Sequence, residues 1–231
     1  MDFLLEVLAD AFRALAGFDS ELVRVVLLTL TVSGIATVIG VLIGVPLGVG
    51  LGLGRFRLRR LLRLGVDVGM GMPPVLAGLF LLVLFWRSGP LGSLGLTFTP
   101  TAMVIAQVLL AVPIAAGVTA AAVEGLPAQA LEQLSALQVS GWQAGVLVVS
   151  EARSGVLASV AASFGRVVSE VGAVLVVGGN ILGETRVLTT LIVQESRQAR
   201  FGTAIAAGIV LLLISLAVNL ALGSRNPEWR R

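Results

Sequence analysis

Long apolar segments dominate the hydrophobicity pattern of this chain. Five of them, separated by shorter polar or turn-rich stretches, cover residues 22–53, 64–86, 100–123, 154–177 and 202–222. A helix needs about 20 predominantly apolar residues to cross the hydrocarbon core of a bilayer. The pattern therefore predicts an all-α integral membrane protein with about five transmembrane helices in a single domain over residues 1–231.

Two of these segments contain features that interrupt or shape a helix. Residues 72–74, Met-Pro-Pro, are expected to break the second segment, because paired prolines cannot keep regular helical hydrogen bonds. The first segment is longer than a span requires, so we expect it to tilt, to bend at Pro46 or to project beyond the membrane. Glycines recur in it every fourth residue, at 40, 44, 48 and 52, and such a stripe lets a second helix approach closely.

The more polar stretches predict how the chain is oriented. Residues 2–16 have one apolar and one charged helical face, which indicates an amphipathic helix at a membrane surface. Residues 55–63, RFRLRRLLR, hold five arginines, and such clusters are typical of cytoplasmic loops. An odd number of spans then places the N-terminal helix (1–19) outside, and the 124–153 loop and the C-terminus inside. Residues 179–201 are of mixed polarity and are expected to lie on the membrane surface.

Composition removes several classes of function. Only 13% of the residues are charged, whereas a soluble domain carries about 25%. The chain has no Cys and no His, which removes thiolate metal sites and the commonest general base. All 16 basic residues are Arg, so the Lys of a Walker A loop is missing. We expect no catalytic site, metal or cofactor in this chain, although a membrane enzyme that uses Asp, Glu or Ser stays open. The modest net charge of +3 fits membrane orientation and no nucleic-acid partner.

The loop at residues 124–153 carries the most specific pattern. One face of a helix predicted after Pro127 gathers the apolar residues Leu126, Ala130, Leu131, Leu134 and Leu137. Gly141 permits a sharp turn, and Trp142 begins a second apolar stretch. A short helix with one apolar face suits docking into a groove on a partner protein. The alternative is a helix that rests on membrane lipid.

This loop resembles the EAA loop of type I ABC importer permeases, which docks onto the ATPase subunit. Glu132-Gln133-Leu134 stands at the Glu-Ala-Ala position of that pattern, and Gln138 stands where the family has Gly, so only the Glu is kept. Other stretches, at residues 72–92, 98–115 and 165–190, resemble permeases for molybdate and tungstate. The last of them is most similar to the tungstate-type branch.

The resemblance implies a homodimeric permease in the cell (inner) membrane that translocates a tetrahedral oxyanion, with tungstate in first place and molybdate in second. ATP and Mg would be bound by two separate ATPase subunits, and an external oxyanion-binding protein would deliver the ion. The implied ATPase-coupling residues are Leu131, Glu132, Gln133, Leu134, Leu137, Gln138, Gly141 and Trp142. The alternatives are an anion channel or an ion-coupled secondary transporter, a class that is commonly larger and built from internal repeats.

Two charged residues, Arg166 and Glu170, lie inside the fourth apolar segment. A charged side chain at the centre of a bilayer costs about 2.5–3.5 kcal/mol. At a spacing of four they would share one helical face and neutralise each other. They are a buried latch between helices or protomers, or a gate beside the translocation path where Arg166 offers a positive field to the oxyanion, or residues that simply lie at the membrane interface. Gly172 would permit a bend in this region, and Asn180 would form a polar cap at its external end.

Overall fold

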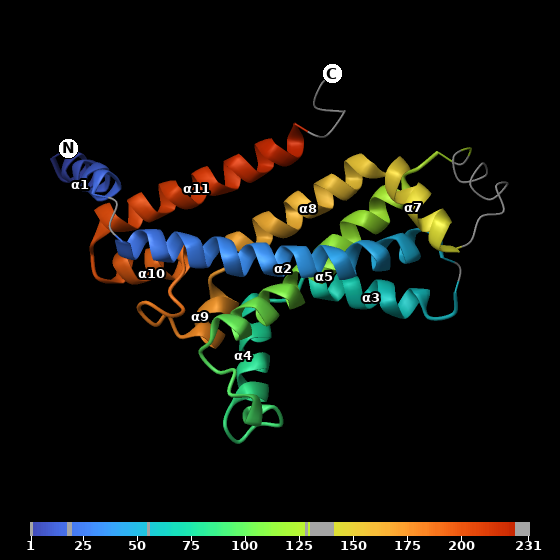
Figure 1. Ribbon diagram of the computed structural model, residues 1–231, viewed down its shortest axis with the longest axis horizontal. Coiled ribbons are helices and arrows are strands. Elements are labelled where there is room, and N and C mark those ends of the chain that lie inside the picture. Colours follow the sequence, from blue (N-terminus) through green and yellow to red (C-terminus); the bar gives the residue numbers. More distant parts are fainter. Residues whose placement is uncertain (1, 18–19, 55, 128, 130–140, 225–231) are drawn as a thin grey trace. The chain divides into compact units, whose positions relative to one another are not determined.

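The chain is described by a computed structural model that covers residues 2–17, 20–54, 56–127, 129 and 141–224 (Figure 1). Within these residues every regular element is a helix, which confirms the all-α fold class. The order is α1 (Asp2–Ala16), α2 (Ser20–Leu53), α3 (Arg59–Met70), α4 (Pro74–Phe85), the 3₁₀ helix η1 (Gly92–Leu94), α5 (Pro100–Glu124), α7 (Gly141–Glu151), α8 (Arg153–Val168), α9 (Gly172–Gly178), α10 (Leu188–Arg197) and α11 (Phe201–Gly223).

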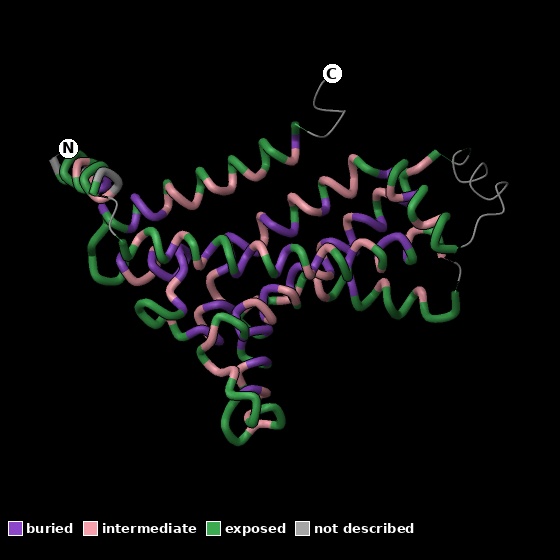
Figure 2. Tube along the Cα trace, in the orientation of Figure 1, coloured by how far each residue is buried: buried purple, intermediate pink, exposed green. Residues whose placement is uncertain are grey.

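Three of these helices, α2, α5 and α11, are long and apolar enough to cross a membrane. Two further pairs, α3 with α4 and α7 with α8, are bent at a short break, and counting each pair as one span gives up to five. The long helices match the predicted segments to within two residues at each end, and α2 continues through Pro46 without interruption. Residues along much of α11 are exposed (Figure 2), which suits a helix surrounded by lipid or by other chains.

The Met-Pro-Pro stretch ends one helix and begins the next, as predicted. Pro73 is extended, with φ −61° and ψ 121°, and Pro74 is the first residue of α4. A proline is tolerated there because the first N–H groups of a helix have no partner within the helix. The fourth apolar segment differs from its prediction, because its helix stops at Val168 and starts again at Gly172.

Internal contacts divide the chain into two compact units, and each is described by itself. Unit 1 comprises Met1–Ala36, Pro73–Gln107 and Val167–Ala217. Its core includes Val25 of α2, Leu188 and Leu191 of α10, and Ala207 of α11. The expectation that residues 179–201 lie on the membrane surface is therefore wrong for α10, which buries one apolar face in this core.

Unit 2 comprises Thr37–Met72, Val108–Arg166 and Val218–Arg231, and the glycine stripe of α2 packs there against α5. A Cβ atom added at any of the four glycines would lie 2.5–2.6 Å from an α5 atom: Gly40 against Ala111, Gly44 against Ala115, Gly48 against Ala116 and Gly52 against Val123. Nonbonded carbon atoms prefer separations of about 3.5–4.0 Å, so only glycine allows this approach. The predicted role of the stripe in close helix packing is confirmed.

Replacing one stripe glycine tests this contact against a matched control on the same helix. In Gly48→Ala the new methyl group would lie 2.5 Å from the carbonyl oxygen of Ala116, whereas a Cβ at Gly50 meets nothing within 4 Å. We expect Gly48→Ala to destabilise the protein by about 1–3 kcal/mol, because backbone atoms must move. Gly50→Ala should be neutral or slightly stabilising. Equal thermal unfolding temperatures for the two variants in detergent would contradict the packing.

Candidate functional site

The two charged residues of the fourth segment lie on either side of a helix end. Arg166 lies in the last turn of α8, which ends at Val168, whereas Glu170 lies in the non-helical stretch before α9. The expectation that Arg166 and Glu170 share one helical face is therefore wrong. Valines at 167, 168 and 171 lower helix propensity at this point, because β-branched side chains lose rotamer freedom in a helix. A positive charge in the last turn of α8 is favourable for the helix dipole.

Glu170 holds the break in place through three hydrogen bonds. Its side-chain oxygen Oε1 accepts from the backbone N–H of Ala173, in the first turn of α9, at 3.2 Å. Its backbone N–H donates to the carbonyl of Val167 at 3.2 Å, and its own carbonyl accepts from the hydroxyl of Thr189 at 2.9 Å. Only 6% of the residue is exposed. Glu170 therefore caps α9 and ties the break to α10.

Two buried polar side chains that the sequence analysis did not single out also form hydrogen bonds at this break. The amide of Gln107, on α5, donates to the carbonyl of Val167 at 3.1 Å, and Thr189 makes the contact with Glu170. The other amide atom of Gln107, Oε1, is buried and has no hydrogen-bond partner among the described residues. A single polar residue in an apolar span is the only signal for Gln107 in the sequence, and nothing there links it to a break 60 residues away.

Gly172 lies where α9 meets α4 in unit 1. A Cβ atom at Gly172 would be 2.6 Å from Cγ2 of Val75, and one at Gly78 would be 2.8 Å from Cα of Ala173. Two glycines thus let the beginnings of two helices touch, each of them directly after a break in the backbone. The structure brings Glu170, Gly172 and the start of α4 together.

Asn180 lies beyond the other end of α9. It adopts a left-handed conformation with φ 54°, directly after Gly179 with φ 71°. Its amide Nδ2 donates to Oε1 of Gln194 on α10 at 2.6 Å, and its Oδ1 is buried with no partner among the described residues. The expected polar cap is thus part of a tight turn that is tied to α10 and does not meet Glu170 directly.

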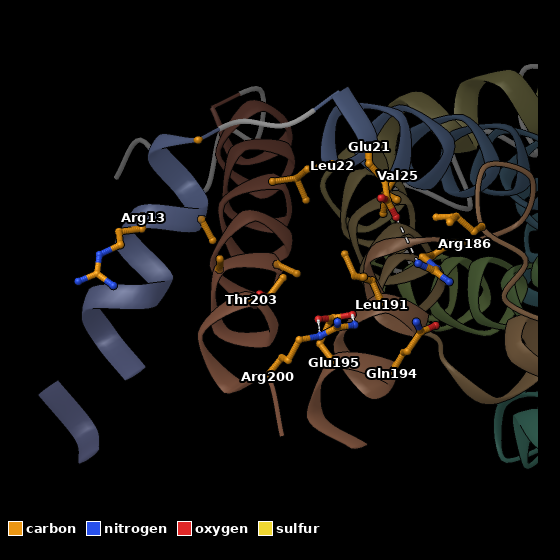
Figure 3. Close-up of a pocket in the computed structure, with 15 residues that line it drawn as sticks. Arg13, Glu21, Leu22, Val25, Arg186, Leu191, Gln194, Glu195, Arg200 and Thr203 are labelled. Carbon is orange, nitrogen blue, oxygen red and sulfur yellow. Dashed lines mark hydrogen bonds and ion pairs between the residues drawn. The ribbon is translucent and has the colours of Figure 1, made fainter. Parts of the chain in front are cut away.

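A cavity of about 640 Å³ lies in unit 1 between α1, α2, α10 and α11 (Figure 3). Its charged lining forms two ion pairs, Arg186 with Glu21 at 3.2 Å and Arg200 with Glu195 at 2.6 Å. Each arginine in these pairs is balanced by a glutamate, and a third arginine of the lining, Arg13, pairs with Asp10 at 2.7 Å. Among the residues that the structure describes, no group of three or more Asp, Glu, His or Cys side chains could hold a metal ion.

Most of the predicted ATPase-coupling residues cannot be placed. Leu131, Glu132, Gln133, Leu134, Leu137 and Gln138 lie outside the described residues. Gly141 and Trp142 are the first two residues of α7, and the Trp142 side chain is 80% exposed. Val146, one turn later on the same face, is 53% exposed, whereas Val148 is buried in unit 2. Trp142 and Val146 therefore expose apolar surface on α7 that no described residue covers.

Comparison with known proteins extends these observations. Residues 44–231 match the family model described as binding-protein-dependent transport system inner membrane component. The chain is 37% identical to the tungstate uptake system permease protein TupB of Peptoclostridium acidaminophilum, over 97% of this chain and 100% of that protein. It is 35% identical to the protein of the same name from Campylobacter jejuni, over 95% of this chain and 92% of that one.

Similarity to a solved structure supports the same fold. A chain of the MetNI methionine ABC transporter, in an inward-facing conformation, superposes with a TM-score of 0.76 over 91% of this chain and 96% of that chain. The two are 19% identical, so this likeness concerns the fold alone. Because the family model covers most of the chain and two relatives align along nearly their whole lengths, the chain belongs to the family of binding-protein-dependent transport system inner membrane components.

Proposed function

We propose that this chain is the permease subunit of an ABC importer that carries a tetrahedral oxyanion into the cytoplasm, with tungstate as the first substrate and molybdate as the second. The observation that carries this proposal is the end-to-end likeness to two tungstate uptake permeases. A shared fold alone would not favour one ion, whereas this likeness to a tungstate permease extends over 97% of the chain.

The energy for transport comes from another chain in this proposal. The sequence has no Lys, so it lacks a Walker A loop, and ATP and Mg belong to separate ATPase subunits. An external oxyanion-binding protein delivers the ion, and a second copy of this chain completes the path. The arginine-rich stretch at residues 55–63 favours an arrangement with the N-terminus outside and the C-terminus in the cytoplasm.

We place the translocation path beside the break between α8 and α9. Non-helical backbone at membrane depth is tolerated where it is buried in protein or lines a wet cavity. Gln107, Glu170 and Thr189 supply buried polar groups at this break, and the first two lie in predicted apolar segments. A permeating ion must not be held tightly, because a deep binding site would trap it. The charge of Arg166, nearby in sequence, suits a weak contact with an anion, and the acidic Glu170 opposes tight binding.

Measurement of cellular tungsten tests the substrate. Deleting the gene should strongly lower the tungsten content of cells supplied with trace tungstate, and a plasmid copy should restore it. Elemental analysis gives tungsten, molybdenum and sulfur from the same sample. Unchanged tungsten with a selective loss of sulfur would contradict the proposed substrate, and no change in any of the three would contradict oxyanion import.

Truncation of an exposed aromatic residue tests coupling to the ATPase. In the proposal, Trp142 contributes to the surface that docks onto the ATPase subunit, together with the segment that contains Glu132. Trp142→Ala should lower co-purification of the ATPase and uptake at least tenfold, because aromatic anchors dominate many interfaces. Trp142→Phe keeps an aromatic ring and should retain most of both. Full ATPase retention in the Ala variant, with the protein folded, would show that Trp142 faces only lipid.

A double-mutant cycle separates the two roles proposed for Arg166 and Glu170. If they form a latch, each single Ala variant should lose about 1–3 kcal/mol of stability, and the double variant should recover part of that loss. If Arg166 instead supplies a field to the passing anion, the double variant should fold but fail to transport. We expect recovery, measured by thermal unfolding beside tungstate uptake. Strictly additive losses would contradict the latch, and normal uptake by all variants would contradict both roles.

A further inference from the structure

The described arginines between the end of α2 and the first turns of α3 differ in the contacts that they make. Arg59 donates from Nε to the carbonyl of Leu51, at the end of α2, at 2.8 Å. Its Nη2 lies 2.8 Å from Oε1 of Glu124, the last residue of α5, and Nη1 of Arg63 lies 2.9 Å from the same oxygen. Arg63 also pairs with Asp67 at 3.5 Å. These two arginines therefore fasten the start of α3 to the ends of α2 and α5 within unit 2.

Arg57 and Arg60 have a different environment. Both residues are exposed, and within the described part of the chain neither side chain makes a hydrogen bond or an ion pair. On α3 the helical repeat turns Arg60 about 100° away from Arg59 and places it one turn before Leu64 on the same side of the helix. No described residue of this chain therefore neutralises their positive charge.

An apolar strip continues from these charges along the same face of α3. Leu61, Leu64 and Val68 are 65%, 58% and 62% exposed. With a rise of 1.5 Å per residue, the strip extends about 12 Å beyond Arg60. Val66, by contrast, faces inward and is buried against Leu51, Ala116 and Ala120. One side of α3 thus presents cationic groups at one end and bare aliphatic side chains beyond them.

We propose that this face of α3 binds an anionic phospholipid, with the headgroup phosphate on Arg57 and Arg60 and an acyl chain along Leu61, Leu64 and Val68. Guanidinium groups form strong, paired hydrogen bonds with phosphate oxygens, and basic residues next to a membrane attract anionic lipids. The order of charge and then apolar surface along the helix matches the order of headgroup and tail in a lipid. An acidic partner protein would neutralise the two arginines. It would, however, leave the apolar strip exposed to water.

Comparison of two arginine pairs in lipid bilayers tests this site. The full-length protein is reconstituted in nanodiscs of pure phosphatidylcholine, or of phosphatidylcholine with phosphatidylglycerol, and its unfolding temperature is measured. Phosphatidylglycerol should raise the unfolding temperature of the wild type by about 4–8 °C. Arg57→Gln/Arg60→Gln should lose this rise while unfolding normally in phosphatidylcholine. Arg59→Gln/Arg63→Gln is the matched control, which should unfold earlier in both lipids but keep the rise.

Two further measurements, with free phosphate and by native mass spectrometry, test the same lipid site. Free inorganic phosphate should not reproduce the rise, because it lacks the acyl chain. Native mass spectrometry of Arg60→Gln should show fewer bound phosphatidylglycerol molecules than the wild type, which gives a readout even if the double variant folds poorly. An equal rise in the wild type and in Arg57→Gln/Arg60→Gln would overturn the proposal. Loss of the ATPase from Arg57→Gln/Arg60→Gln, with an unchanged lipid response, would also overturn the proposal. It would assign the two arginines to a protein interface.

Discussion

The structure depends on how the backbone of an apolar chain is hydrogen-bonded where its helices break. Inside a bilayer no water replaces a lost helical hydrogen bond, so each break needs polar side chains from elsewhere in the chain. Glu170 caps α9, Thr189 donates a hydrogen bond to the carbonyl of Glu170, and Gln107 donates one to the carbonyl of Val167. At the end of α2, the side chain of Arg59 likewise donates a hydrogen bond to the carbonyl of Leu51. Gln107 and Glu170, two polar side chains that the chain retains in its apolar segments, thus form hydrogen bonds with backbone.

Close packing is arranged by small residues at different places in the two units. In unit 2, the four glycines of the α2 stripe pack against the alanine-rich face of α5 over about three turns. In unit 1, Gly78 and Gly172 bring the short helices α4 and α9 into contact directly after their breaks. Long helices fixed by a stripe resist rearrangement, whereas short helices that begin at a break can reorient about it. A permease that must open and close a path needs both rigidly packed helices and helices that can reorient. The contrast between the two units therefore supports a gate near α9.

Much of the fold could be predicted from the sequence because apolar length decides which helices can span a bilayer. The ends of α2, α5 and α11, the break at residues 72–74 and the glycine stripe all follow from local patterns. The fourth segment was less predictable, because Val-Val-Ser-Glu-Val continues the apolar pattern while its backbone leaves the helix. Periodicity cannot reveal that Glu170 bonds Ala173, or that Gln107 and Thr189 converge on this break from distant segments. The burial of α10 was missed for the same reason, since Thr29 of α2 receives the N–H of Leu188 across 159 residues.

In the mechanism that we propose, the break between α8 and α9 borders the aqueous path of the anion. Ser169 lies in this break and is exposed, and the native chain has no Cys, so Ser169→Cys offers a unique reporter. The measurement is the rate at which a small, anionic, membrane-impermeant thiol reagent modifies this cysteine in the reconstituted transporter, with and without ATP. The account predicts rapid modification that changes severalfold with ATP and slows in the presence of tungstate. Absence of modification in every condition, with the variant still transporting tungstate, would contradict a path beside this break.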